Sequence, residues 1–171
     1  MPEFSFIVHA EDQPLTTLLS LHPCRHYRGD EILLVGGAPQ DEGWLSGLVD
    51  QSFPDGTPEM AARQAWGETL VFLREGMLPP DDMAALLHQA VASGGLWGYF
   101  HAWPADLSGR LRALWSNRFR PRNGEALQRR LWFMRRSLLR ELPEEGMFSP
   151  LLLARIAGAP VRIAVGVDCR E

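Results

Sequence analysis

The sequence predicts an α/β fold, a small and mostly parallel sheet of three or four strands covered by several helices. Short runs that are apolar on both faces suit buried strands and occur near both ends of the chain. Longer segments with helical spacing lie between them, as in parallel sheets with helical crossovers. The length of 171 residues suits one domain.

The first third of the chain predicts two strands and a short helix. Residues 4–9 are apolar on both faces and predict a buried strand. Pro14 suits the first turn of a helix over 14–21. Residues 31–35 predict a second strand, which Gly36-Gly37 ends. The glycine- and proline-rich residues 36–57 then predict a long connection with at most one helical turn.

Helical patterns dominate the middle of the chain. Thr57-Pro58-Glu59 combines a hydroxyl N-cap, a proline at the first position and an early acid, so we expect a helix from there to Gly76. A second helix is expected over 80–94. The aromatic residues 96–103 predict a strand, although a buried helical turn has the same pattern.

The last third predicts three helices and a final strand. One helix is expected over 104–119, and a longer one from Asn123 to about Leu142. The apolar stripe of the longer helix is spaced by four, three, four and four residues: Leu127, Leu131, Met134, Leu138 and Leu142. Ser149-Pro150 starts a short helix that Gly158 ends, and 161–167 predict a strand.

Composition narrows the function classes. All 17 basic residues are arginine, which excludes a Schiff-base lysine, a P-loop lysine and a Ser-Lys dyad. Two cysteines, Cys24 and Cys169, do not form a disulfide framework, and free thiols are favoured. We see no targeting segment and no apolar run long enough for a membrane span, so we expect a cytoplasmic protein without a membrane partner.

Charge is distributed unevenly along the chain. Residues 110–140 hold ten arginines and one acid, a formal charge of +9 in a chain of net charge −4. Three interpretations stay open: surface pairing within the protein, an acidic protein partner, and nucleic acid. Nucleic acid is the least favoured, because the whole chain is acidic and the nearby aromatic residues suit a core.

The sequence has only weak matches to motifs of catalytic, metal-binding or nucleotide-binding sites. His22, Cys24 and His26 could converge on an extended segment, but the spacing is not a standard zinc motif, so a polar loop is favoured over a metal site. Gly36-Gly37 follows a strand, where phosphates often bind, yet the dinucleotide fingerprint is incomplete and a structural turn is favoured. We therefore expect no catalytic residue, no metal and no cofactor.

Three segments carry a family resemblance. Residues 6–15 run from a strand into an Ala-Glu-Asp-Gln-Pro-Leu turn, residues 107–115 are rich in leucine and arginine, and Arg130 to Arg135 are followed by Leu138-Leu139. They resemble the type VI secretion effector adaptors, although Phe133-Met134 replace the Asp-Pro of that family. The resemblance implies a chaperone that hands an effector to the secretion spike, with Arg130 and Arg135 in partner-contacting or structural roles.

These observations predict a non-enzymatic protein-binding protein of a bacterial secretion or toxin system. It would act as an effector adaptor, with an immunity protein as the second version. A small nucleotide- or metal-using enzyme and a nucleic-acid-binding protein remain alternatives. The expected partner is a secreted effector or toxin with an acidic surface, and its predicted contacts are Arg118, Arg120, Arg122, Arg129, Arg130, Arg135, Arg136 and Arg140.

Overall fold

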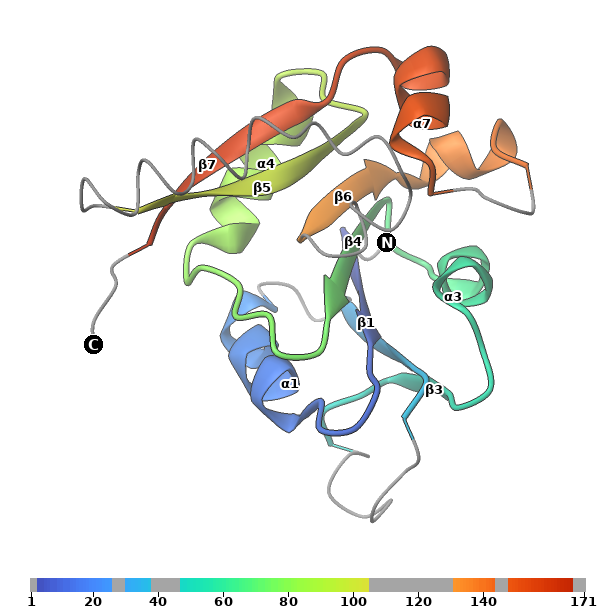
Figure 1. Ribbon diagram of the computed structural model, residues 1–171, viewed down its shortest axis with the longest axis vertical. Helices are drawn as coiled ribbons and strands as arrows, with labels where there is room; N and C mark the ends of the chain where they lie inside the picture. Colours follow the sequence, from blue (N-terminus) through green and yellow to red (C-terminus); the bar gives the residue numbers. More distant parts are fainter. Residues whose placement is uncertain (1–2, 26–29, 38–46, 105–130, 144–147, 168–171) are drawn as a thin grey trace.

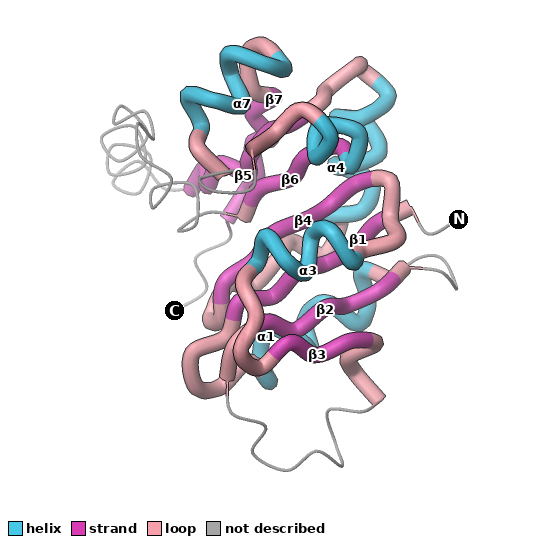
Figure 2. Tube along the Cα trace, turned by 90° about the vertical axis from the view of Figure 1, so that its right-hand side faces the viewer, coloured by secondary structure: helices cyan, strands magenta, loops and turns pink. Residues whose placement is uncertain are grey.

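A computed structural model describes residues 3–25, 30–37, 47–104, 131–143 and 148–167. The fold is α/β, as expected, but the sheet has seven strands rather than three or four (Figures 1 and 2). The strands are β1 Phe4–His9, β2 Glu31–Val35, β3 Gln51–Phe53, β4 Thr69–Arg74, β5 Trp97–Pro104, β6 Trp132–Arg135 and β7 Val161–Val167. The described helices are α1 Leu15–Leu21, α3 Pro58–Gln64, α4 Met83–Ala92 and α7 Pro150–Ala157, with 3₁₀ turns η1 His22–Cys24 and η2 Arg136–Arg140.

The strand order is β3-β2-β1-β4-β6-β5-β7. Strands β1 to β4 run parallel to one another, β6 is antiparallel to both of its neighbours, and β7 is parallel to β5. The chain moves from β1 to β2 and β3 on one side, then returns to place β4 on the other side of β1. The strand order therefore reverses between β1 and β4, the position at which open α/β sheets bind ligands.

Helices cover both faces of the sheet and create two apolar cores. On one face, α1 and α4 pack over alternate side chains of the strands, among them Phe6, Val71 and Phe133. On the other face, α3 and α7 cover the intervening side chains, such as Phe72 and Trp132. Strands buried on both faces need apolar residues at every position, which explains the continuous apolar runs of the sequence.

The helix expected over 57–76 is wrong beyond Gln64. Its start is confirmed, because Thr57 caps α3 by accepting the N–H of Met60 at 3.3 Å. The chain leaves the helix before Gly67, where an added Cβ would lie 2.5 Å from the Ser5 hydroxyl. The apolar residues that follow form β4 and not another helical turn, because they pair with β1 and fill both cores.

The helix expected from Asn123 to Leu142 is also wrong within the described residues. Residues 105–130 lie outside them, as does the helix expected over 104–119. Trp132, Phe133 and Met134 are all buried, so they form β6 between β4 and β5. Leu138 and Leu142 are buried after the strand, on η2 and just beyond it. The helical spacing of Met134, Leu138 and Leu142 therefore comes from strand β6 and from η2 with the residues just after it, and not from one helix.

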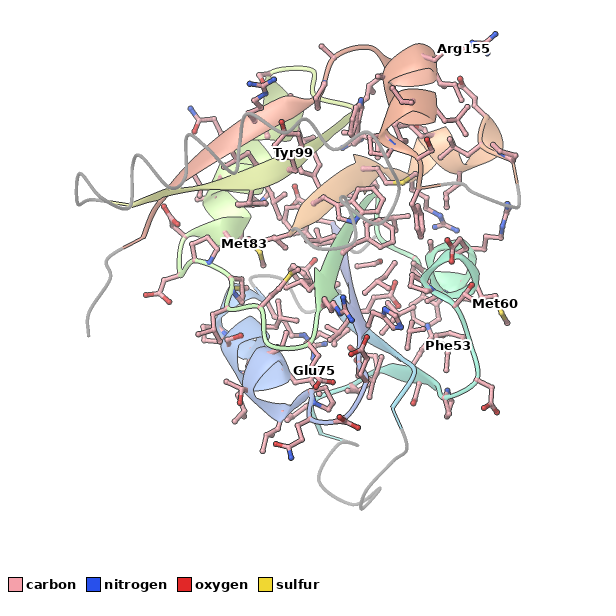
Figure 3. The ribbon with its side chains drawn as sticks, in the orientation of Figure 1. Phe53, Met60, Glu75, Met83, Tyr99 and Arg155 are labelled. Carbon is pink, nitrogen blue, oxygen red and sulfur yellow. The ribbon has the colours of Figure 1, made fainter. Side chains whose placement is uncertain are left out.

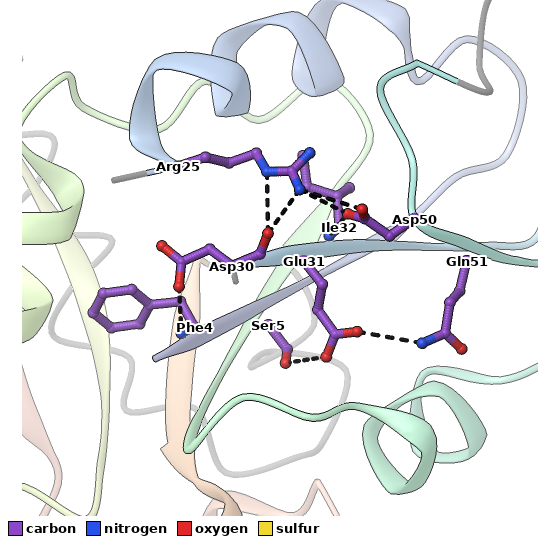
Figure 4. Close-up of polar contacts among 8 residues, drawn as sticks. All are labelled: Phe4, Ser5, Arg25, Asp30, Glu31, Ile32, Asp50 and Gln51. Atoms are coloured by element: carbon purple, nitrogen blue, oxygen red, sulfur yellow. Dashed lines mark hydrogen bonds and ion pairs between the residues drawn. The ribbon is translucent and has the colours of Figure 1, made fainter. Parts of the chain in front are cut away.

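A polar network ties together the amino ends of strands β1, β2 and β3, which we call the amino edge of the sheet (Figure 4). The buried carboxylate of Glu31 accepts hydrogen bonds from the Ser5 hydroxyl at 2.6 Å and the Gln51 amide at 3.3 Å. It also accepts the backbone N–H of Trp66, while Gly67 N–H donates to the Ser5 hydroxyl at 2.7 Å. Glu31 therefore joins β1, β2, β3 and the segment that leads into β4.

The longest described helix, α4, has ten residues. Within the described part of the chain, no helix has both the length and the apolar character needed to span a bilayer.

Candidate functional site

The carboxyl ends of β1, β2 and β4 meet at the reversal point of the sheet. Backbone hydrogen bonds hold them in register: Ala10 N–H donates to Val35 at 2.8 Å, and Glu75 N–H donates to His9 at 2.9 Å. Gly36 N–H donates to Phe53 at the end of β3, at 3.0 Å. We call this edge the β1/β4 cradle, made of residues 9–12, 36–37 and 74–75.

Glycines form one wall of the β1/β4 cradle. Gly36 and Gly37 both have a φ of 72°, a left-handed conformation that side chains rarely adopt. A Cβ at Gly36 would lie 2.6 Å from the carbonyl oxygen of Ala10. The expected structural turn is therefore confirmed, and it leaves backbone without side chains beside the end of β1. Such a wall lets a ligand approach the backbone closely.

Glu75 organises the opposite wall (Figure 3). Its carboxylate accepts the backbone N–H groups of Glu11 at 2.6 Å and Asp12 at 2.8 Å. Desolvation acts to raise the pKa of Glu75, but the backbone N–H groups of Gln13, Asp12 and Glu11 and the charge of Arg74 outweigh it and lower that pKa. Arg74 also pairs with the carboxylate of Glu11. The loop after β1 is thus fixed by Arg74, the last residue of β4, and by Glu75, which follows it.

Most of the charged side chains of the β1/β4 cradle are acidic. Three of its residues are acidic, Glu11, Asp12 and Glu75, and one, Arg74, carries a guanidinium group that pairs with Glu11. A hollow of about 20 Å³ reaches His9 from the α3 face, where Trp132 is one of its lining residues. That volume is about the size of one water molecule, so a larger ligand would have to lie over the cradle rather than inside the core.

The sequence-predicted ligand cluster does not assemble in the described residues. Cys24 is buried on η1, where its thiol donates weakly to Ser20 and Pro80 carbonyls at 3.7 and 4.0 Å. Burial, and then the charge of Asp81, raise the pKa of this thiol. His26 lies outside the described residues. Among the residues that the structure describes, no three His, Cys, Asp or Glu side chains form a metal-binding group.

Three of the arginines predicted to contact a partner come together. Arg135, Arg136 and Arg140 line a hollow at the other end of β4, beside Arg63 of α3. They lie on a strand and a 3₁₀ turn, not on the exposed side of a long helix. The other predicted contacts, Arg118, Arg120, Arg122, Arg129 and Arg130, lie outside the described residues.

No family model matches the sequence, and no curated protein does either. Among solved structures, the chain is similar to S. aureus TarS 1-349, with a TM-score of 0.59, 14% identity and coverage of 95% of this chain and 58% of that one. It is similar to a CMP:2-keto-3-deoxy-manno-octonic acid synthetase complexed with CTP, with a TM-score of 0.57, 14% identity and coverage of 96% and 91%.

A third similar structure is the mannosyltransferase PcManGT from Pyrobaculum calidifontis, in complex with GDP-Man and Mn²⁺. Its TM-score is 0.57 and its identity is 18%, with 99% of this chain covered and 58% of that one. The chain therefore spans about three fifths of TarS 1-349 and of this mannosyltransferase. At these identities the likeness shows the fold.

Two of these structural neighbours are enzymes by name, a synthetase and a mannosyltransferase. The expectation of a non-enzymatic adaptor or immunity protein is therefore wrong, since these enzymes share the fold over nearly the whole chain. The associated chaperone and secretion roles are corrected with it. The resemblance to effector adaptors remains a prediction from sequence motifs, and one of its segments, Arg130 to Arg135, contains strand β6.

Sequence reasoning missed Arg74 and Glu75 because it placed them in a helix. The signal was present: four consecutive apolar residues, 70–73, are followed by two charged residues and Gly76. A short, fully apolar run that ends in glycine is typical of a buried parallel strand. Charged residues directly after such a strand are candidates for a ligand site.

Proposed function

We propose that the chain is a transferase domain that binds a nucleoside-diphosphate sugar over the β1/β4 cradle and transfers the sugar to a hydroxyl acceptor, releasing the nucleoside diphosphate and the hydroxyl proton. The observation that carries the proposal is the strand reversal between β1 and β4, with two left-handed glycines at its edge. Ligands bind outside the carboxyl ends of such strands. Two of the similar structures are complexes with a nucleotide, CTP or GDP-Man, and they support a nucleotide as that ligand.

Charge favours a nucleoside diphosphate over a triphosphate. A triphosphate concentrates about four negative charges and needs several cations to neutralise it. The described residues of the cradle offer one cation, Arg74, among three carboxylates. A diphosphate linked to a sugar carries about half that charge. The neutral backbone at Gly36-Gly37 can approach such a ligand without adding repulsion.

A divalent metal does not fit the described arrangement. The mannosyltransferase is similar in fold and was solved with Mn²⁺, an ion that prefers carboxylate oxygens. Here the Glu75 carboxylate is used by two backbone N–H groups, and that of Glu11 by Arg74. Moreover, no three His, Cys, Asp or Glu side chains of the described residues converge to hold such a cation. We therefore assign the nucleotide contacts to the backbone of Gly36-Gly37 and to Arg74, whose guanidinium group would exchange its partner Glu11 for the diphosphate.

Binding of UDP- and GDP-sugars, measured by calorimetry with CTP for comparison, tests the proposal. We expect a nucleoside-diphosphate sugar to bind and to raise the melting temperature by mass action. Gly36→Ala should weaken binding by about tenfold, because the new Cβ and the strain at positive φ displace the cradle.

Gly158→Ala is the matched control. Gly158 also has a positive φ, 79°, but an added Cβ there meets nothing within 4 Å and it lies at the end of α7. Its variant should lose less stability than Gly36→Ala, whose Cβ meets a backbone oxygen, and should keep its affinity. Tighter binding of CTP than of every diphosphate sugar, or equal loss of affinity in both variants, would contradict the proposal.

A further inference from the structure

A second hollow, of about 620 Å³, lies at the amino end of β4, the opposite end from the β1/β4 cradle. Arginines surround it: Arg63 from α3, Arg135 from β6, and Arg136 and Arg140 from η2. We call it the arginine hollow. Because β4 is six residues long, the two sites are separated by about 17 Å, the length of the strand.

The arginine hollow carries an excess of positive charge. Its lining has four guanidinium groups and one carboxylate, Glu68, which pairs with Arg135 at 3.4 Å. The formal excess is three positive charges in a protein of net charge −4. Arg63 and Arg140 are exposed, so their guanidinium groups remain accessible. Like charges held together in one hollow repel each other unless an anion neutralises them.

Trp66 gives the arginine hollow an apolar wall. Its side chain is 61% exposed, which is unusual for a residue that supplies so much apolar surface. Its backbone is nevertheless fixed at both ends, because its N–H donates to buried Glu31 and its carbonyl accepts from Arg136 at 3.1 Å. An anchored and exposed indole beside accessible guanidinium groups suits a ligand with both an apolar and an anionic part.

We infer that the arginine hollow binds an organic phosphate, with the phosphoryl group on the guanidinium groups and an apolar or aromatic group on Trp66. Guanidinium groups bind phosphoryl oxygens through paired, charge-assisted hydrogen bonds. The inference is independent of the proposed function, because the two sites use different residues at opposite ends of β4. A variant that loses binding at one site still allows binding at the other site to be measured.

Calorimetry with 1-naphthyl phosphate and inorganic phosphate tests this inference. The naphthyl ester should bind more tightly than inorganic phosphate, and added salt should weaken both. The double variant Arg63→Gln/Arg140→Gln should weaken both by about tenfold, since each exposed arginine contributes to one charge-assisted contact. Trp66→Ala should reduce the affinity for the ester to about that for inorganic phosphate, and leave the latter unchanged within about twofold.

Arg155→Gln is the control for charge alone. Arg155 is exposed and projects from the outer end of α7, away from α3 (Figure 3). Its removal should change neither affinity by more than about twofold. Circular dichroism should show an unchanged fold for every variant, because the replaced side chains are exposed.

Three results would overturn the inference. The first is an equal loss of affinity in Arg155→Gln and in the double variant. The second is an ester that binds no better than inorganic phosphate. The third is tighter binding of a hexaglutamate peptide or a short oligonucleotide than of the ester, which would assign the arginines to an acidic protein or to nucleic acid instead.

Discussion

At the scale of single residues, Glu31 and Glu75 show two ways in which this protein keeps a carboxylate inside a polar network. Glu31 is 2% exposed, so it loses its hydration and depends on the hydroxyl, amide and N–H donors around it. Glu75 lies near the surface and accepts two backbone N–H groups. The first ties the amino edge of the sheet, and the second shapes the β1/β4 cradle.

Replacement of Glu31 tests the network at the amino edge. Glu31→Leu should lower the free energy of unfolding by about 3 kcal/mol, because it leaves the Ser5 hydroxyl and the Trp66 N–H without an acceptor. Glu31→Gln keeps an acceptor oxygen and should lose about half as much. Urea denaturation measures both values. An equal effect of the two substitutions would show that these hydrogen bonds do not hold the edge.

Glu75 predicts a pH dependence of stability. Its folded-state pKa lies below the ordinary 4.5, so its contribution is present above that pH and is lost as the pH falls through the lowered value. Glu75→Gln should cost on the order of 1 kcal/mol at neutral pH. The difference from the unmodified protein should shrink as the pH falls through the lowered pKa, below which both carry a neutral side chain.

Urea denaturation across this pH range measures the Glu75 effect. Asp55→Asn, at an exposed acid after β3, serves as the control and should change stability little. A difference between Glu75→Gln and the unmodified protein that stays constant with pH would contradict the assigned role of the carboxylate.

At the scale of elements, β6 is the decisive strand. It joins the parallel half of the sheet to β5 and β7, running antiparallel to both neighbours. The junction is crowded, because a Cβ at Gly98 of β5 would lie 2.3 Å from the carbonyl oxygen of Val161 and 2.8 Å from the Phe133 ring. Glycine at this position therefore lets three strands approach closely.

Gly98→Ala should destabilise the protein by about 2 kcal/mol or more, because backbone on one side and a buried ring on the other prevent relaxation. Gly47→Ala is the control, since a Cβ there would meet nothing within 4 Å. Thermal denaturation compares the two variants. A Gly98→Ala melting temperature equal to that of Gly47→Ala would contradict the close approach of β5, β6 and β7.

At the scale of the whole molecule, one sheet divides two cores, and every central strand contributes to both. Trp132 stacks on Phe72 with ring centroids 4.1 Å apart and contacts Phe148 on the α3 and α7 face. Its neighbour Phe133 belongs to the core under α1 and α4. Neighbouring residues of β6 thus support different halves of the protein.

Truncation of a large buried side chain on either face of the sheet should therefore lower the free energy of unfolding by a similar amount. Trp132→Ala and Phe133→Ala should each lower the free energy of unfolding by about 3–5 kcal/mol, the range for large side chains removed from cores. Leu151→Ala, at a side chain that is 65% exposed on α7, should change it by less than about 0.5 kcal/mol. A large loss in only one of the two aromatic variants would contradict a strand buried on both faces.

The chain's local pattern determined a good part of this structure. Strands β1, β2, β5 and β7 and helices α1, α4 and α7 lie where their apolar runs, prolines and glycines predict them. The turn at Gly36-Gly37 was predictable too. These elements are specified by residues that are close together in the sequence, so the local sequence pattern is enough to predict them.

Tertiary structure decided the rest. The run that became β4 and the segment that became β6 have apolar patterns that also suit helices, and only pairing with β1 and β5 selects strands. The three-residue β3 is stabilised by its register against β2 rather than by its own sequence. The β1/β4 cradle and the arginine hollow each collect residues from distant segments, because a site depends on strand order and local spacing does not encode that order.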